Sequence, residues 1–338
     1  MNFDQHVLTI DAAAEVERIV AALQHTTRQV LRRHGAVVGV SGGVDSSVAL
    51  ALCVRAFGPQ RVVAVMLPEK DSDDDTRRLS AQVARHYGIE PVLEDITPVL
   101  DGFGCYRRRD EAIRQIFPEY NADAGYKAKI VLPQNLLDEE TLNVFTLTIV
   151  TPEGEERSKR LPPRAFAQIV AATNFKQRTR MAMLYYHAEL RNYAVVGTAN
   201  KNERDQGFFV KYGDGGVDVK PIEHLFKTQV YQLARYLDVP EEIQRRPPTS
   251  DTYSAPSTQE EFFFRLPFET MDVIWYALEH GIPAEAAANA LGFTPAQVQR
   301  VFDDLIRKQR STAYLRMPPL PLDEQSVANA ARFEETVL

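Results

Sequence analysis

The chain has 338 residues, 44% of them hydrophobic and 25% charged, with a formal net charge of −7. This composition is typical of a globular protein long enough for one large domain or two. The acidity argues against a general nucleic-acid binder, because phosphate contacts require clustered Lys and Arg. No segment approaches the length of a membrane span and the N-terminal stretch lacks a signal-peptide pattern, so we expect a cytoplasmic protein.

The N-terminal third alternates helical and strand-like segments. Residues 11–34 carry an apolar helical stripe, residues 36–38 form an apolar run, and a helix follows the next turn to about residue 57. The remaining segments are a strand at 61–67, a helix at 73–87 and a strand at 92–96. This alternation predicts an α/β fold with a doubly wound parallel sheet, whose ligands bind beyond the carboxyl ends of the strands.

A glycine-rich turn connects the first predicted strand to the helix after it. It has the sequence Gly-Val-Ser-Gly-Gly-Val-Asp-Ser-Ser, from residue 39 to residue 47. Glycines allow the backbone to aim N–H groups at one point, Ser hydroxyls add donors and the helix dipole favours an anion, so the turn predicts a phosphate site. It is not a Walker A loop, because no Gly-Lys-Ser/Thr follows. A carboxylate here would repel phosphate unless a cation lay between them, so Asp45 indicates Mg²⁺.

Residues 119–165 interrupt the alternation. Residues 142–150 alternate apolar and polar side chains, residues 152–155 are typical of a turn, and residues 157–163 resemble a returning strand. We therefore expect an inserted β-hairpin. It is either a surface elaboration, a flap over the active site or a dimer contact, and the sequence does not choose between them.

The α/β pattern returns after residue 165. A helix extends to about residue 190, and a strand at 193–198 brings the segment 198–203 to the ligand-binding edge of the sheet. Residues 207–218 are rich in Gly and acidic side chains, which is typical of an exposed loop or a ligand cradle. The next elements are a helix at 223–237 and a rigid loop at 246–251.

The C-terminal part is predicted to be helical. Residues 284–305 resemble a helix-turn-helix, but the second helix carries only Arg300 beside Asp303 and Asp304. Because DNA binding needs basic side chains there, we interpret the segment as a helical pair that packs on the catalytic domain. We expect a synthetase domain at 1–270, which includes the insertion, and a helical extension at 271–338.

Four segments together resemble the ammonia-dependent NAD synthetases. That family belongs to the ATP pyrophosphatases, which have the adenine nucleotide α-hydrolase fold. The segments are Ser-Gly-Gly-Val-Asp-Ser at 41–46, Gly-Thr-Ala-Asn-Lys-Asn-Glu at 197–203, Lys-Tyr-Gly-Asp-Gly-Gly-Val-Asp at 211–218 and Lys-Thr-Gln at 227–229. The first motif indicates only the superfamily, whereas the third is far more specific. The resemblance covers residues 11–103 and 165–251.

The resemblance implies a ligase that amidates deamido-NAD with ammonia. ATP would adenylate the nicotinate carboxylate with loss of pyrophosphate, and ammonia would then displace AMP. Attack on the α-phosphate builds up negative charge, which Lys, Mg²⁺ and backbone N–H groups can stabilise. The resemblance also implies a homodimer. Its ammonia would be free or come from a separate glutaminase chain, because no nitrilase-like module remains in the sequence.

The resemblance also implies roles for individual residues. Asp45, Glu203 and Lys227 would be catalytic, and the two carboxylates would hold Mg²⁺. Arg178, Lys211 and Asp218 would bind deamido-NAD. The ATP-binding residues would be Gly39, Val40, Ser41, Gly42, Gly43, Val44, Asp45, Ser46, Thr198, Lys227 and Thr249.

The C-terminal end departs from the family pattern. The family has His-Lys-Arg before a Pro-rich segment, where this chain has Tyr314, Leu315 and Arg316. Replacing Lys by Leu removes a cation that could pair with a substrate pyrophosphate. Residues 254–271 are also more aromatic than the acidic loop usual at this place. One alternative is therefore an amide synthase for a different carboxylic acid, and another is a nucleotide-binding protein without catalysis.

Overall fold

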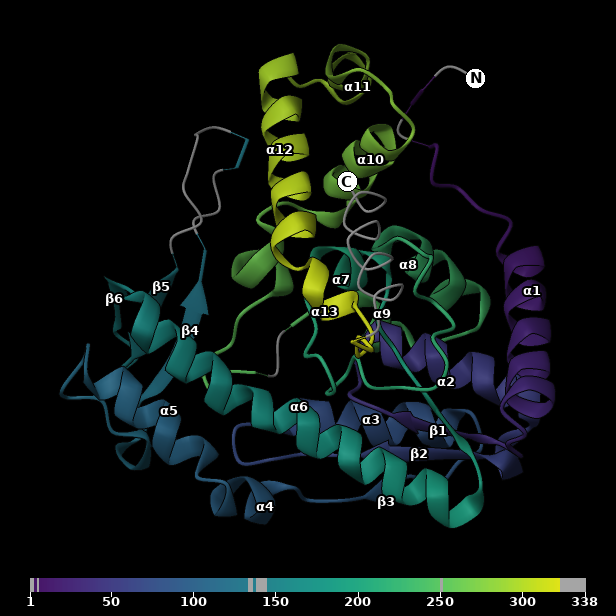
Figure 1. Cartoon of the computed structure of the whole chain (residues 1–338), viewed down its shortest axis with the longest axis horizontal. Helices are drawn as coiled ribbons and strands as arrows, with labels where there is room; N and C mark the ends of the chain where they lie inside the picture. The colour runs from purple at the N-terminus through teal and green to yellow at the C-terminus, as the bar shows by residue number, and fades with distance from the viewer. Residues whose placement is uncertain (1–2, 5, 133–135, 138–144, 250–251, 323–338) are drawn as a thin grey trace.

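The computed structural model describes residues 3–4, 6–132, 136–137, 145–249 and 252–322. Its centre is a four-stranded parallel sheet with the strand order β3-β2-β1-β7 (Figure 1). Ala36 of β1 is in register with Val62 of β2 on one side and with Ala194 of β7 on the other. The strands are β1 (Ala36–Gly39), β2 (Val62–Met66), β3 (Val92–Leu93) and β7 (Ala194–Val196). The predicted α/β fold with a parallel sheet is confirmed.

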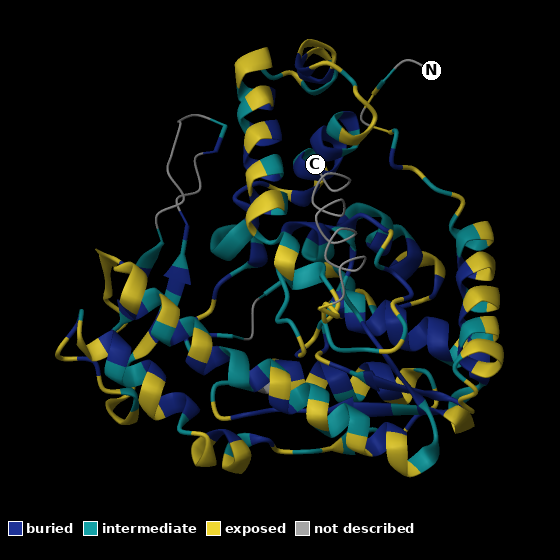
Figure 2. Ribbon diagram, in the orientation of Figure 1, coloured by how far each residue is buried: buried dark blue, intermediate teal, exposed yellow. Residues whose placement is uncertain are grey.

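Helices cover both faces of this sheet, because β1 buries its side chains alternately in two cores. Val38 packs with residues of α1, α2, α3 and α8, whereas Val37 packs with residues of α4, α5 and α6. A strand that is apolar on both faces is typical of a doubly wound sheet, and β1, β2 and β7 are accordingly almost wholly buried (Figure 2). The helices are α1 (Ala12–His25), α2 (Val44–Phe57), α3 (Asp74–His86), α4 (Thr97–Gly102), α5 (Cys105–Arg114), α6 (Pro163–Arg191), α7 (Lys201–Gln206), α8 (Lys227–Tyr236) and α9 (Glu241–Arg245).

Two predicted helices differ from the structure at their ends. Asp11 begins α1 as expected, since its side chain accepts hydrogen bonds from the backbone N–H groups of Ala13 and Ala14, both at 3.0 Å. The helical backbone then ends with the π-helical segment η1 (Thr26–Val30), before Arg32 turns to a φ of 54°, so the expected end at residue 34 is wrong. The helix expected from residue 223 begins only at Lys227, because a turn precedes it.

The insertion contains the predicted hairpin and one strand that the sequence analysis missed. Strands β5 (Thr146–Val150) and β6 (Glu156–Arg160) are antiparallel, and β4 (Lys127–Val131) pairs with the other side of β5. This small sheet shares a core with α5 and the start of α6. Residues 142–144 of the predicted hairpin lie outside the described residues. Short helical segments η2 (Pro59–Arg61) and η3 (Ala122–Ala124) complete this half of the chain.

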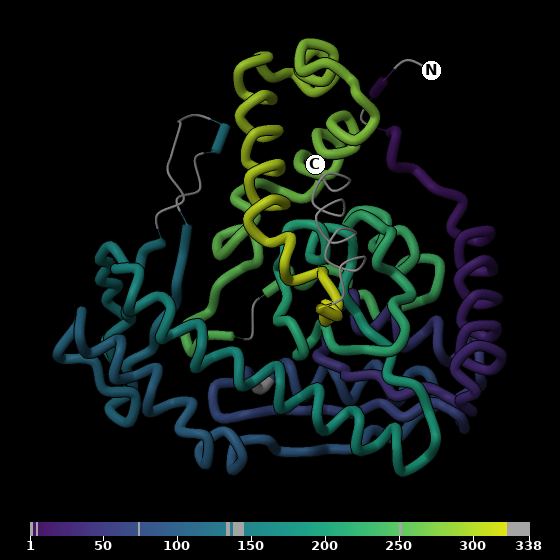
Figure 3. The backbone as a smooth tube through the Cα atoms, viewed as in Figure 1, coloured from purple at the N-terminus to yellow at the C-terminus, as the bar shows by residue number. Residues whose placement is uncertain are grey.

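The C-terminal helices form a separate core around Trp275, which is fully buried. They are preceded by the π-helical segment η4 (Glu260–Phe264) and comprise α10 (Phe268–Glu279), α11 (Ala284–Leu291), α12 (Pro295–Ser311) and α13 (Ala313–Arg316). The chain descends along α12 and ends its described part beside the loops that follow β7 (Figure 3). Across the described ranges, helices of the length and apolarity that a membrane span requires are absent.

Candidate functional site

The glycine loop lies at the carboxyl end of β1 and leads directly into α2. Gly42 has a φ of 71°, and a Cβ atom there would lie 2.8 Å from the Cβ of Leu79, so a side chain would collide with α3. Ser46 donates a hydrogen bond to the Gly43 carbonyl at 3.0 Å and accepts one from the Ser41 N–H at 3.3 Å. These bonds fix the loop where the N-terminal N–H groups of α2 can bind an anion.

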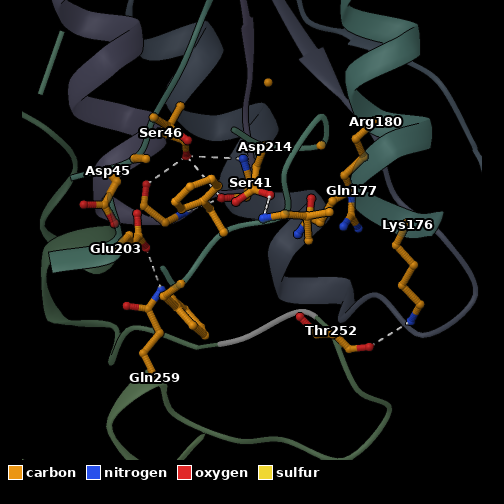
Figure 4. A pocket seen from close by; sticks show the side chains of 18 of the residues that line it. Ser41, Asp45, Ser46, Lys176, Gln177, Arg180, Glu203, Asp214, Thr252 and Gln259 are labelled. Carbon is orange, nitrogen blue, oxygen red and sulfur yellow. Dashed lines mark hydrogen bonds between the residues drawn. The ribbon is translucent and has the colours of Figure 1, made fainter. Parts of the chain in front are cut away.

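Two carboxylates and a lysine meet beside this loop. Asp45 accepts a hydrogen bond from Asn200 Nδ2 at 2.9 Å and forms an ion pair with Lys227. The Asn200 backbone N–H donates to Glu203 Oε2 at 3.3 Å, and the Asn200 side chain accepts from the Glu203 N–H at 3.0 Å. Asn200 therefore orients both Asp45 and Glu203, which lie side by side in Figure 4.

The charges of this group depend on one another. Desolvation, followed by the nearby Asp45 carboxylate, raises the pKa of Glu203 to about 8. Burial alone would lower the pKa of Lys227, but Asp45 and then Glu203 raise it above its ordinary value. The Lys227 side chain is 1% exposed and therefore remains a cation within an otherwise acidic group.

A cavity of about 760 Å³ opens above these residues. It has the size of a nucleotide-binding pocket. Every residue expected to bind ATP lines it, except that Gly42 packs against α3 instead. Thr198 reaches the cavity at the end of β7, and Thr249 reaches it from a segment that forms a β-bridge with Thr258.

The residues expected to bind deamido-NAD are only partly brought together. Arg178 and Lys211 line the cavity, and Lys211 Nζ donates to the Tyr314 carbonyl at 2.9 Å. Asp218 is not among the lining residues. Its carboxylate accepts hydrogen bonds from the Tyr185 hydroxyl at 3.0 Å and the Val195 N–H at 2.8 Å. Asp218 thus ties α6 to β7, and a direct contact with a ligand stays a prediction.

One face of α6 forms a side of the cavity that the sequence analysis did not assign. Asn174, Gln177, Arg178 and Met181 all line it, and Gln177 is labelled in Figure 4. Their spacing of three, one and three residues places them on one face of a helix. This periodicity of polar residues next to Arg178 was the available signal. Asp214, inside the Lys-Tyr-Gly-Asp-Gly-Gly motif, also lines the cavity and was not singled out.

A buried ionic cluster supports the same side of the cavity. Lys176 donates to Glu69 at 3.0 Å, to Asp71 at 2.7 Å and to the Thr252 carbonyl at 3.1 Å. Burial would raise the pKa of Asp71, but Lys176 and Arg109 together hold it below its ordinary value. Lys176 thereby connects α6, the segment after β2 and the loop after Thr249 (Figure 4).

Aromatic and C-terminal residues close the cavity on the remaining side. Phe262 and Phe263 from η4 line it, together with Tyr314 and Leu315 from α13. The two residues that replace the family's basic pair therefore lie in the cavity wall. Arg316 keeps the expected Arg and donates to the carbonyls of residues 204 and 205 at 3.3 and 3.0 Å, which anchors α13 to α7.

Comparison with known proteins gives this arrangement a family. The NAD synthase family model matches residues 15–132 and 135–319. The NH(3)-dependent NAD(+) synthetase of Mesorhizobium japonicum is 51% identical over 314 residues, which cover 93% of this chain and 98% of that protein. The enzyme of the same name from Rhizobium meliloti is 50% identical over 94% of each chain.

Solved structures agree on the fold. The NH3-dependent NAD synthetase from Campylobacter jejuni subsp. jejuni aligns with a TM-score of 0.60 and 22% identity, over 93% of this chain and 100% of that one. The NMN synthetase from Francisella tularensis aligns with a TM-score of 0.58 and 21% identity, with the same coverage. The family match and the full-length relatives agree with the motifs and the geometry of the cavity, and the chain belongs to the NAD synthase family.

Proposed function

We propose that this chain is an ammonia-dependent NAD synthetase. It would convert deamido-NAD, ATP and ammonia into NAD, AMP and pyrophosphate through an acyl-adenylate. The observation that carries the proposal is the meeting of the glycine loop, Lys227 and Glu203 in one cavity that Arg178 and Lys211 also line. Relatives with this name, about 50% identical over nearly the whole chain, support the same reaction.

The residues of the cavity floor suit the first half of this reaction. The N–H groups at the start of α2 and the Ser hydroxyls of the loop would hold the ATP phosphates. Attack of a carboxylate on the α-phosphate transfers negative charge to the phosphate oxygens and the leaving pyrophosphate. Lys227, fixed by Asp45, would stabilise that charge, because a buried cation needs no reorganisation when the charge develops.

The donor set beside the loop fits Mg²⁺. Asp45 and Glu203 are hard oxygen ligands, and burial, followed by the nearby Asp45 carboxylate, raises the pKa of Glu203, which supports a site that would accept added positive charge. A buried acceptor without a partner, Gln259 Oε1, belongs to the same group. When bound, Mg²⁺ would neutralise phosphate charge and polarise the α-phosphate. Clusters of three or more acidic, His or Cys ligands are absent from the described part of the chain.

The second half of the reaction requires ammonia and little water. Ammonia attacks the carbonyl carbon of the acyl-adenylate, the amide bond forms, and the bond to AMP breaks. Phe262, Phe263 and Leu315 give the cavity an apolar wall, which disfavours hydrolysis of the intermediate. The ammonia is free or delivered by a separate glutaminase chain.

A second candidate substrate follows from the C-terminal segment. Tyr314 and Leu315 line the cavity where the family pattern has a basic pair, so one cation for a substrate pyrophosphate is missing there. Lys211 donates a hydrogen bond from Nζ to the Tyr314 carbonyl, so it supplies a positive charge next to these two residues. A carboxylic acid other than deamido-NAD is favoured as the substrate only if Tyr314 and Leu315, in place of the basic pair, prevent the dinucleotide from binding.

A homodimer is part of the proposal. Large apolar side chains are exposed along α6 and its neighbours β3 and α4, which is unusual for a surface that faces only water. Those exposed by more than 40% are Leu93, Val99, Phe103, Tyr186 and Leu190. The proposal also includes a synthetase domain at 1–270 and a helical extension at 271–338. An enzyme that consumes ATP is expected in the cytoplasm.

The deciding assay follows AMP and NAD together by mass spectrometry. The purified protein is supplied with Mg-ATP, ammonium and deamido-NAD, and in parallel with nicotinate mononucleotide, which has the same carboxylate but lacks the adenylate half. Equal amounts of AMP and NAD, abolished by Asp45→Ala, are the expected result. AMP release with the mononucleotide alone would favour the second candidate, and ATP binding without AMP release would leave only a nucleotide-binding protein.

A further inference from the structure

Gln259 presents a buried oxygen atom without a partner next to Glu203. The residue is 9% exposed, and its Nε2 donates a hydrogen bond to Glu203 Oε1 at 3.1 Å. Within the described residues, its Oε1 has no hydrogen-bond partner. Buried polar atoms are nearly always paired in folded proteins, so an orphaned acceptor at the edge of a ligand cavity points to a group that arrives with the ligand.

The surrounding chain fixes Gln259 from two sides. Its backbone N–H donates to the Pro248 carbonyl at 2.8 Å, next to the β-bridge between Thr249 and Thr258. At the other end of the segment, Lys308 of α12 donates to the Phe263 carbonyl at 2.9 Å. The side chain is therefore held toward Glu203 by contacts to two separate parts of the fold (Figure 4).

The chemistry of the neighbouring groups identifies what the oxygen accepts. Asp45 and Glu203 lie together with the buried cation Lys227, so the group holds two carboxylates for one positive charge, and a third oxygen beside them favours a further cation. Amide and carboxylate oxygens are the ligands that divalent hard cations prefer. The Nε2 group of Gln259 meanwhile holds Glu203 in place, as outer ligands commonly do around a metal.

We propose that Gln259 is a positioning residue of the cation site, which fixes Glu203 through its N–H group and offers Oε1 as a further oxygen to the divalent cation held by Asp45 and Glu203. The inference rests on the proposed function only in requiring that cation. It assigns the aromatic segment after Thr258 a role in the metal chemistry as well as in the cavity wall.

Gln206 is a matched control. It is fully buried, its Oε1 is likewise without a partner among the described residues, and its Nε2 donates to the Leu305 carbonyl at 3.5 Å. It lies on α7 like Glu203, but it is not among the residues that line the cavity. Gln206→Met and Gln259→Met therefore remove the same chemical group from sites of similar burial.

The experiment measures Mn²⁺ binding to the full chain. The EPR signal of free Mn²⁺ is followed during a titration of the protein saturated with α,β-methylene-ATP. A parallel titration without protein is subtracted to remove the Mn²⁺ bound by the nucleotide alone. We expect Gln259→Met to raise the Mn²⁺ dissociation constant roughly 10- to 100-fold, the usual effect of losing a supporting ligand, and Gln206→Met to leave it unchanged. Gln259→Glu should bind at least as well as the wild type, because its carboxylate supplies the same oxygen with added charge.

Two results would overturn the inference. Wild-type Mn²⁺ affinity in Gln259→Met would mean that the side chain only fills space. Equal losses in Gln259→Glu and Gln259→Met would mean that the N–H group alone matters. Thermal unfolding checks that each variant is folded. If Gln259→Met does not fold, Mn²⁺ binding is measured instead with Gln259→Asn, whose shorter side chain withdraws the oxygen by one methylene.

The outcome is separable from the proposed reaction. If Mn²⁺ affinity depends on Gln259 but the wild type forms no NAD, the substrate assignment fails and the cation inference stands. If the wild type forms NAD and Mn²⁺ affinity is independent of Gln259, the inference alone fails.

Discussion

The proposed chemistry depends most directly on Lys227, which forms a buried ion pair with Asp45. Lys227→Met keeps the volume of the side chain but removes the cation that faces the phosphates. We expect kcat to fall roughly 10²- to 10³-fold, the range for loss of one transition-state donor, measured as AMP release. Lys220→Met, which removes a 37% exposed lysine paired with Glu223, is the control and should leave kcat unchanged.

The same pair predicts a coupling in stability. Lys227→Met leaves the mostly buried Asp45 carboxylate without its ion-pair partner, which is strongly destabilising. The double variant with Asp45→Asn removes that isolated charge. We therefore expect the double variant to melt at a higher temperature than Lys227→Met alone in calorimetry, and an equal or lower melting temperature would contradict the coupling.

Asp272 makes the stability depend on pH. It is fully buried and accepts hydrogen bonds from the Asn202 side chain and from the N–H and hydroxyl of Thr228, and burial raises its pKa to about 6. The Asp272 carboxyl therefore binds its proton more tightly in the folded chain than in the unfolded chain. Its contribution to the free energy of unfolding is fully present below about pH 4 and is lost as the pH rises through about 6.

Asp272→Asn removes this titration. We expect the free energy of unfolding of the wild type, minus that of the variant, to fall by on the order of 2–3 kcal/mol as the pH rises from about 4 to 7. Urea unfolding at a series of pH values measures it. A gap that stays constant over this range would show that Asp272 does not titrate with a raised pKa, and Asp303→Asn on the polar face of α12 provides the baseline.

Elements with a local pattern were predictable, and those that depend on distant partners were not. The strand, glycine turn and helix at 36–57 were expected because apolar runs and a phosphate-type turn adjoin in the sequence. Strand β4 alternates buried and more exposed side chains, but its assignment depends on β5, which follows after a long gap. The backbone end of the first helix depended on Arg32 adopting a left-handed conformation, for which the sequence has no strong signal.

The candidate site divides in the same way. The motif residues Asp45, Glu203 and Lys227 were expected together, and the structure brings them together. Lys176 and Gln259 were not expected, because their partners come from elements far apart in the sequence. Such contacts arise only when the fold brings those elements side by side, so no local spacing identifies them.

Helix α13 acts as a strap over the cavity, and this predicts a truncation effect. A chain that ends at Thr312 loses Tyr314 and Leu315 from the cavity wall and frees Lys211 from the Tyr314 carbonyl. We expect kcat/KM for deamido-NAD to fall roughly tenfold or more, because misplaced binding groups weaken orientation of the substrate.

A chain that ends at Leu322 is the control for this truncation. It keeps every residue of the described cavity wall, and its kcat/KM should equal that of the full chain. Arg316→Met tests the strap without truncation, since it removes the hydrogen bonds to the carbonyls of α7 together with those to the Gln309 carbonyl and the Thr312 hydroxyl. Full kcat/KM in the chain ending at Thr312 would show that α13 has no part in substrate binding.

The whole molecule exposes an apolar face that a second copy would cover. Glu94, just after β3, accepts a hydrogen bond from His187 of α6 at 2.9 Å, and Phe103 stacks on Phe175 farther along α6. Tyr186 and Leu190 of α6 and the neighbouring Phe103 are exposed, and burying such apolar side chains is the main driving force of association.

The dimer is tested by placing charges on that surface. The wild type is expected to have twice the chain mass of 38.1 kDa in light scattering after gel filtration. Tyr186→Asp combined with Leu190→Asp should give the monomer mass, because two carboxylates would be desolvated in the interface. Val30→Asp changes an equally exposed apolar residue on η1, which packs with α1 on the opposite face of the sheet, and should remain dimeric. A monomeric wild type would exclude the homodimer, and dissociation by Val30→Asp would place its interface elsewhere.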